Sequence, residues 1–306
     1  MNGDKVFRAY NVWPSFPSVS ISGTACALAC KHCEARYLEY MIPATTPDTL
    51  VMLGDKFARE KKPGLLISGG CDKIGRMLNL GKFLPAIKRL HDLGLIIKLH
   101  TGLVDEELAK GIADAGVDIA SMEFVGDAGT VSEIFGISAT PDDYAETFLM
   151  LQAAGIPFIA PHIAVCLHRG ALRGEKRALS MLEKVVEPST IAIIAFRPTK
   201  GTAMERDPAP KAEDIGEVVA HARALFPDIN IVLGALRPRG PERSEDARAY
   251  RLSLELAALE AGASGIEVPS PGILEEARAR GYRIKWIEAY GVLPTEYEGR
   301  VKTHWA

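Results

Sequence analysis

The chain has 306 residues, of which 47% are hydrophobic and 25% charged, and its formal net charge is −3. These values fit one large globular domain or two small ones with a sizeable core, and they exclude a small disulfide-stapled module. The balanced charge shows no bias toward nucleic acid or an acidic membrane. The first twenty residues lack the apolar segment of a signal peptide, and no later apolar run could span a bilayer. We therefore expect a cytoplasmic protein with neither a nucleic-acid nor a membrane partner.

Short apolar runs alternate with amphipathic stretches along the whole chain. The predicted strands are residues 18–22, 64–68, 95–100, 117–124, 156–165, 190–196, 229–233 and 264–268. The clearest predicted helices, each closed by a glycine, are residues 83–94, 105–116, 141–155 and 244–262. A glycine at that place predicts a left-handed helix end, after which the next strand follows almost at once.

The predicted strands are continuously apolar, which is typical of parallel strands covered on both faces. Eight strand–helix units in about 280 residues favour a TIM-type (β/α)8 barrel, complete or nearly so, over a doubly wound sheet, which usually needs fewer strands. We expect residues 1–17 to form an N-terminal extension, residues 18–280 the barrel, and residues 281–306 a C-terminal extension outside or capping it. No linker marks a second domain.

Three of the five cysteines lie in the segment CALACKHC, between Cys26 and Cys33. An odd, clustered cysteine set is not a secreted disulfide framework. The segment follows the first predicted strand, at the end of a barrel where chemistry gathers, and its thiolates suit a soft metal centre. Zinc would need a fourth ligand; no second Cys-x2-Cys exists, and His32, between two cysteines, should point elsewhere. A four-iron cluster held by Cys26, Cys30 and Cys33 would leave one iron open.

The spacing Cys26-x3-Cys30-x2-Cys33 after the first barrel strand resembles the signature of radical S-adenosylmethionine (SAM) enzymes. The resemblance implies that the three cysteines are the metal ligands and catalytic centre of a [4Fe-4S] cluster whose open iron chelates SAM. It also implies reductive cleavage of SAM to a 5′-deoxyadenosyl radical, which abstracts hydrogen from an unactivated C–H bond. His32 stands where the family commonly has an aromatic residue and would place a flat ring near the adenine.

Three further segments are similar to the biotin synthase-like branch of this superfamily. They are residues 140–158, TPDDYAETFLMLQAAGIPF, residues 196–204, FRPTKGTAM, and residues 244–268, which end in AGASGIEV. The resemblance thus runs from about residue 18 to residue 268, over nearly the whole predicted barrel. The cysteine motif is its most specific part.

The resemblance also implies residues that contact SAM. The loop after the second strand, Ser68-Gly69-Gly70-Cys71, resembles the family's Gly-Gly-Glu edge and would hold the SAM ammonium. The alternative for this loop is a tight turn with Cys71 as a small buried hydrophobic residue. Glu123, at the end of the fourth strand, would bind the ribose or the ammonium of SAM; its alternative is a structural ion pair.

Two more strand ends carry candidates. His162 and Cys166 stand at positions that are often glycine in the family and would line the adenine pocket, unless they are core residues. Arg197 would bind the SAM carboxylate or an anionic substrate. The other basic residues expected at this mouth are Lys200, Arg237 and Arg239. A solvated loop is the alternative for these arginines.

The reaction is left open between two kinds of enzyme. Single-cluster rearrangement or one-carbon chemistry on a small or carrier-bound substrate is the first, with a ferredoxin or flavodoxin as electron donor. The second is sulfur insertion of the biotin or lipoyl synthase type, with a partner enzyme as an option. Archaeal-type lipoyl synthases also belong to this biotin synthase-like group. The sequence does not favour a second iron–sulfur cluster. Only Cys71 and Cys166 remain outside the motif, and Ile67, Lys98 and about Ala160 occupy the strand positions that match the ligands of the second cluster in biotin synthase. A non-catalytic iron–sulfur or zinc protein for sensing or electron transfer is the alternative of another class.

Overall fold

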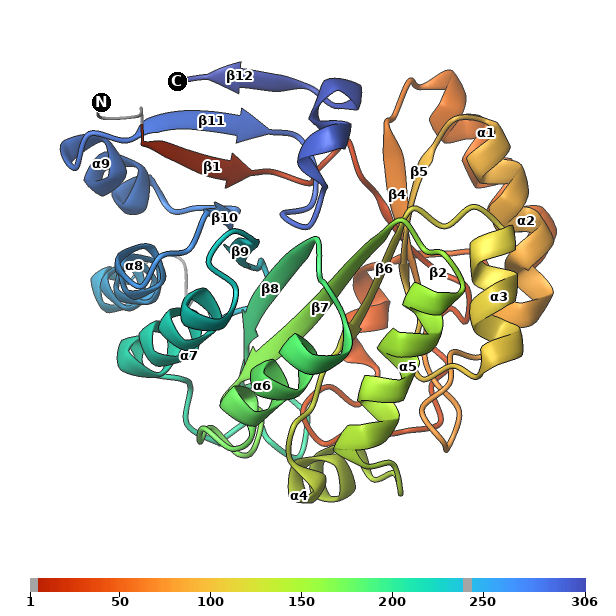
Figure 1. Cartoon of the computed structure of the whole chain (residues 1–306), viewed down its shortest axis with the longest axis horizontal. Coiled ribbons are helices and arrows are strands. Elements are labelled where there is room, and N and C mark those ends of the chain that lie inside the picture. Colours follow the sequence, from red (N-terminus) through yellow and green to blue (C-terminus); the bar gives the residue numbers. More distant parts are fainter. Residues whose placement is uncertain (1–4, 239–243) are drawn as a thin grey trace.

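The computed structural model describes residues 5–238 and 244–306. Its strands form one curled sheet in the order β12-β11-β1-β10-β9-β8-β7-β6-β5-β4-β2-β3, in which only the β11–β12 pair is antiparallel. Figure 1 shows helices packed around the outside of this curved sheet. The prediction of a TIM-type barrel is confirmed, as a curled barrel whose strand pairing ends at β3 and β12.

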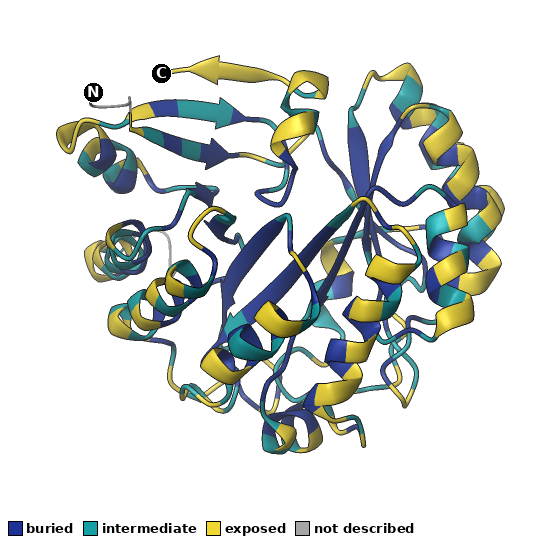
Figure 2. Ribbon diagram, viewed as in Figure 1, coloured by how far each residue is buried: buried dark blue, intermediate teal, exposed yellow. Residues whose placement is uncertain are grey.

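All eight predicted strands are present and follow one another in the sheet. They are β2 (Ser18–Ser20), β4 (Gly64–Ser68), β5 (Ile96–His100), β6 (Ile119–Glu123), β7 (Phe158–Val165), β8 (Thr190–Ala195), β9 (Asn230–Leu233) and β10 (Gly265–Glu267). Every residue of β4 and β8 is buried, as expected for strands covered on both faces. Figure 2 shows the buried strands inside and the exposed residues on the outer sides of the helices.

The helices between these strands present an apolar face to the sheet. They are α1 (Pro47–Arg59), α2 (Leu80–Asp92), α3 (Glu106–Asp114), α4 (Ala128–Thr130), α5 (Pro141–Ala153), α6 (Glu175–Val185), α7 (Ala212–Leu225), α8 (Glu245–Glu260) and α9 (Pro271–Ala279). The four glycines expected after helices all have positive φ, between 75° and 101°. Among the described residues, no helix combines the length and the apolar character that crossing a membrane requires.

Four strands were not predicted: β1 (Val6–Tyr10), β3 (Ile42–Pro43), β11 (Arg283–Ile287) and β12 (Thr303–Trp305). β1 and β11 mix buried and half-exposed positions and carry charged residues, so they lack the continuous apolar run of an inner strand. β1 pairs in parallel with β10, and β11 pairs in parallel with β1, so both strands extend the barrel sheet.

The C-terminal segment closes the barrel at the amino-terminal ends of its strands. Buried residues between Ile287 and Leu293 pack inside the barrel against Ile96 and Ile119, the first residues of β5 and β6. The Tyr297 hydroxyl donates a hydrogen bond of 2.7 Å to Asp118, just before β6. This end of the barrel is therefore filled by side chains, and the opposite end carries the cysteine segment.

Candidate cofactor site at the barrel mouth

The three cysteines of the motif lie on the loop that follows β2. Cys30 is buried, and Cys26 and Cys33 are half-buried. The Sγ atoms of Cys30 and Cys33 and a ring nitrogen of His32 all lie within 4.8 Å of one another. His32, which we expected to point elsewhere, thus lies beside two of the thiols. Cys26 is outside this group, and its Sγ accepts a hydrogen bond of 3.4 Å from the amide of Cys71.

The backbone of the loop brings Cys30 and Cys33 together. The amides of Cys33 and Glu34 both donate to the carbonyl of Cys30, at 3.1 and 2.8 Å. Ala29, Glu34 and Ala35 all have positive φ, which is unfavourable for residues with a β-carbon, and such strain clusters at functional sites. The turn is therefore held in a strained conformation that places the two thiols side by side.

The two neighbouring thiols differ in acidity. Hydrogen bonding from the Cys30 thiol lowers the pKa of Cys33 against the effect of burial, and the nearby His32 lowers it further. The same contact with Cys33, and burial, raise the pKa of Cys30. Cys33 is thus the first of the pair to become a thiolate, the form that binds a metal.

The loop after β4 packs directly on the cysteine loop. A β-carbon on Gly70 would lie 2.1 Å from the carbonyl oxygen of Ala25 and 2.5 Å from the β-carbon of Cys26, so only glycine fits. The amide of Gly70 donates to the Ser22 hydroxyl at 2.7 Å, and the amide of Ala27 donates to the carbonyl of Cys71 at 2.7 Å. The predicted segment 68–71 is therefore brought to the thiols.

A pocket beside the cysteine loop contains three of the predicted side chains. His32, Glu123 and Arg197 line it together with Tyr37, and its cavity volume is about 50 Å³. The Arg197 guanidinium lies 5.6 Å from the centre of the Tyr37 ring. A carboxylate and a guanidinium on one pocket can bind the ammonium and the carboxylate of an amino acid, and the flanking rings suit a flat heterocycle.

A cluster fits this place on the chemistry of its donors. Cys26, Cys30 and Cys33 offer three soft sulfur atoms on one loop. The Nδ1 atom of His32 is buried and has no hydrogen-bond partner among the described residues, although a buried polar atom normally has one. A group bound beside it would supply that partner.

Two predicted residues lie elsewhere. Cys166 is fully buried between the sheet and the helices, where its amide donates to Glu175 on α6 and its pKa is raised by burial. Arg237 has no exposed surface and donates to the buried Glu255 on α8 at 2.6 Å, so it is a structural ion pair, not a mouth residue. Arg239 lies outside the described residues.

His162 lies beside the pocket, at the position of β7 that pairs with Glu123 of β6. It is on the inner face of β7, where its ring is 5.0 Å from that of His100 on β5. It is therefore not among the residues that line the pocket at the mouth.

The sequence did not indicate two neighbours of the site. Ser22 accepts from Gly70, and Phe135, in the short π-helix Val131–Phe135, packs its ring 5.4 Å from that of His32. The amide of Lys31 also donates to the carbonyl of Ile134 in that helix, at 2.9 Å. The glycines at 129 and 136 that bracket this helix were the only sequence signal for it.

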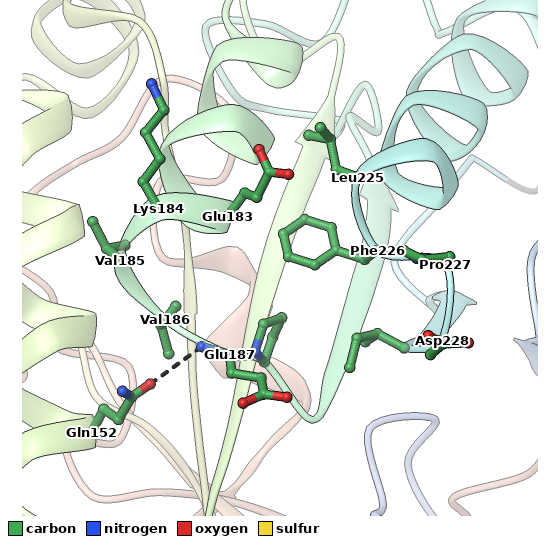
Figure 3. A pocket seen from close by; sticks show the side chains of 12 residues that line it. Gln152, Glu183, Lys184, Val185, Val186, Glu187, Leu225, Phe226, Pro227 and Asp228 are labelled. Atoms are coloured by element: carbon green, nitrogen blue, oxygen red, sulfur yellow. Dashed lines mark hydrogen bonds between the residues drawn. The ribbon is translucent and has the colours of Figure 1, made fainter.

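A second pocket lies at the amino-terminal end of the barrel, shown in Figure 3. It is formed by the turns before β8 and β9 and is lined by Glu183, Lys184, Phe226 and Asp228, among others. The amide of Glu187 donates to the side chain of Gln152 there, at 3.3 Å. In barrels of this kind the chemistry lies at the carboxyl ends of the strands, so we do not assign the reaction to this pocket.

No family model matches the sequence. Among curated proteins, the chain is 28% identical to biotin synthase of Coxiella burnetii over 188 residues, which are 60% of this chain and 56% of the relative. The chain thus matches little more than half the length of that protein.

Among solved structures, the chain is similar to HydG, a maturase of the [FeFe]-hydrogenase, with a TM-score of 0.63 and 16% identity over 92% of this chain and 64% of that one. It is also similar to methylornithine synthase (PylB), with a TM-score of 0.58 and 16% identity over 88% and 74% of the two chains. Identities this low establish the fold alone. The predicted resemblance to the biotin synthase-like branch is confirmed by the sequence match to biotin synthase, and the two solved structures share the barrel fold.

Proposed function

We propose that this protein is a radical SAM enzyme that holds one [4Fe-4S] cluster on Cys26, Cys30 and Cys33. The observation that carries the proposal is the position of the three thiols, on one loop over the carboxyl ends of the barrel strands. A cluster held there would supply the electron for the reductive cleavage of SAM to a 5′-deoxyadenosyl radical. The chain's own residues position SAM and the substrate and exclude water from the pocket.

The neighbouring side chains have separate roles in this proposal. The backbone of segment 68–71, packed on the cysteine loop, and the Glu123 carboxylate hold the SAM ammonium. Arg197 binds the SAM carboxylate, and the His32 ring lies against the adenine. All of these groups come from different strand ends, so the curled sheet is what brings them together.

The proposed reaction is hydrogen abstraction from an unactivated C–H bond of a small or carrier-bound substrate. A ferredoxin or flavodoxin would supply the electron in the cytoplasm, where the five free thiols stay reduced. The proposal includes a single cluster, because the two remaining cysteines lie apart. Cys71 lies against Cys26, whereas Cys166 faces the helices.

Sulfur insertion, with a partner enzyme, is the second candidate. The similarity to biotin synthase favours it. A second cluster on this chain would need about four ligands, and Cys71 and Cys166 supply two thiols on different faces of the sheet. A sulfur donor would therefore have to come from another protein.

The test is anaerobic reconstitution followed by iron and sulfide analysis and a SAM cleavage assay with a chemical reductant. We expect about four irons per chain and formation of 5′-deoxyadenosine. Replacing Cys26, Cys30 and Cys33 together by alanine should abolish both the brown chromophore and the product. The matched control, the Cys71→Ala, Cys166→Ala double variant, should keep both.

Two outcomes contradict the proposal in different ways. A triple variant that still binds iron and cleaves SAM ends the assignment of the cluster. About six to eight irons in the wild type, falling to about four in the double variant, would establish a second cluster and favour sulfur insertion. Iron binding without any SAM cleavage would favour a sensing or electron-transfer protein.

A further inference from the structure

Four polar side chains point into the barrel below the cysteine loop: Lys98 and His100 on β5, Ser121 on β6 and His162 on β7. We call them the interior polar cluster. Ile96, Ile119 and Ala160 pack inside the barrel, and the cluster residues lie two or four positions further along the same strands, so they share the inner face. They come from three adjacent strands and lie between the filled end of the barrel and its mouth.

The cluster lacks the hydrogen-bond partners that buried groups normally have. Lys98, Ser121 and His162 are 4%, 0% and 6% exposed. The buried Nε2 atoms of both histidines and the Oγ of Ser121 have no partner among the described residues. The His100 and His162 rings meet edge to face, with their centres 5.0 Å apart, so they converge on one place above β6. Unsatisfied buried polar atoms are unfavourable, and several together indicate a bound ligand.

The positive charge of Lys98 indicates that this ligand is an anion. The Lys98 ammonium lies 4.4 Å from the centre of the Tyr290 ring, and Glu267 and Glu123 act on it electrostatically without a direct ion pair among the described residues. Glu267 already accepts hydrogen bonds from the amides of Ala235 and Gly291, at 2.7 and 2.6 Å. Glu123 pairs in register with His162, but its side chain lines the mouth pocket. The cluster therefore combines one cation with hydroxyl and imidazole groups that can donate hydrogen bonds.

Burial and the charge of Lys98 hold the pKa of both His100 and His162 well below the ordinary value, so the rings are neutral at pH 7. Two neutral imidazoles could in other surroundings bind a metal ion. Here the ammonium two residues before His100 on the same face opposes a second cation. An anionic oxygen group satisfies all four side chains at once.

We propose that the interior polar cluster binds the carboxylate of the substrate, so that this acid enters the barrel carboxylate first with its chain directed to the mouth. Lys98 forms the ion pair, and His100, Ser121 and His162 donate hydrogen bonds. This inference rests on the proposed function, because the C–H bond that reacts must lie near the cysteine loop. It specifies the substrate class as a short-chain carboxylic acid.

The depth of the cluster sets the length of the chain. Ala164 lines the mouth pocket and is two residues beyond His162 on the inner face of β7. Two residues of a strand span about 7 Å, close to the length of a hexanoate chain. A carboxylate bound at the interior polar cluster would therefore place its far carbons beside Ala164, in the pocket that Arg197 also lines.

The test is calorimetric titration of the anaerobically reconstituted full chain with hexanoate, in the absence of SAM and reductant. We expect hexanoate to bind and hexylamine and hexanol to bind at least tenfold more weakly. Lys98→Met should weaken hexanoate by about 10- to 100-fold. Lys88→Met, on the exposed face of α2, is the matched control and should leave hexanoate binding unchanged. Hexanoate should also shift the side-chain 15N resonances of His100 and His162.

Several results would overturn the inference. They are a wild type that does not bind hexanoate at 10 mM, hexylamine binding as tightly as hexanoate, or a Lys98→Met variant that binds hexanoate like the wild type. Binding of Zn²⁺ that Lys98→Met retains and a His100→Asn, His162→Asn double variant loses would mark a metal site instead. The iron–sulfur content and SAM cleavage are measured separately. A chain that keeps both but does not bind hexanoate therefore refutes only this inference. Hexanoate binding by a chain that does not cleave SAM refutes only the proposed function.

Discussion

Gly70 touches the cysteine loop so closely that a β-carbon on it would lie 2.5 Å from the β-carbon of Cys26. The contact joins the loop after β4 to the loop after β2, which are neighbouring strands. The amide of Cys71 donates to the Cys26 thiol at the same junction. The position of Cys26, the one thiol outside the Cys30–Cys33 pair, therefore depends on this glycine.

We predict that Gly70→Ala lowers the iron content of the reconstituted protein at least severalfold, because the added methyl group must push the Cys26 segment away. Gly69→Ala is the matched control, since its β-carbon would come no closer than 3.3 Å to any neighbouring atom. Iron and sulfide analysis of both variants, alongside circular dichroism, checks the prediction. A Gly70→Ala protein with the iron content of the wild type would show that Cys26 is placed in another way.

Arg237 and Glu255 form an ion pair without any solvent exposure, and Arg237 also donates to the carbonyls of Gly234 and Glu267. We predict that Arg237→Met lowers the free energy of unfolding by about 3 kcal/mol, because a buried carboxylate loses its main partner. Lys88→Met, which breaks an exposed pair with Asp92, should change it by less than about 1 kcal/mol. Urea denaturation measures both. An equal effect of the two substitutions would contradict this account.

The lowered pKa of Lys98 predicts how the free energy of unfolding depends on pH. Burial lowers its pKa from 10.5 to about 8, against the opposing effects of Glu267 and Glu123. Between these two values the unfolded chain binds more protons at Lys98 than the folded chain does, so this residue makes stability rise with pH. Below pH 8 the lysine is charged in both states and its full destabilising effect remains.

We therefore compare the free energies of unfolding of Lys98→Met and the wild type. The value for Lys98→Met minus the value for the wild type should fall by about 1 kcal/mol between pH 7 and pH 9. Comparing the two proteins cancels the titration of the groups that do not interact with Lys98. Urea denaturation at several pH values checks the result. A difference that is the same at pH 7 and pH 9 would mean that Lys98 is not held in a desolvated place.

Tyr297 fixes the C-terminal segment to the barrel through its hydrogen bond to Asp118, which is 5% exposed and also accepts from the amide of Ile97. We predict that Tyr297→Phe lowers the unfolding free energy by about 1 to 2 kcal/mol, because one Asp118 oxygen loses its donor. Tyr40→Phe, at a tyrosine that is 82% exposed, should have no measurable effect. Thermal unfolding of both variants gives the comparison, and equal melting temperatures for the two would contradict the role of the bond.

The sequence by itself determined the eight barrel strands, the helices between them and the loop that carries the thiols. Each of these depends on interactions within a few residues. Continuous apolar runs such as residues 64–68 require cover on both faces, and a helix that ends at Gly94 needs the positive φ that glycine allows. Cys26, Cys30 and Cys33 lie within eight positions, so their spacing on one loop is visible without any tertiary information.

Only the tertiary structure decided what the side chains at the strand ends contact. Cys166 has a φ of 60° and turns into the helical layer, although its place after β7 suggested the mouth. Arg237 finds its partner eighteen residues later, on α8. His100 and His162 meet across β6 because the curled sheet brings its inner faces together. Sheet curvature and packing bring together residues that are far apart in the chain. Neither can be predicted from a local pattern of residue types.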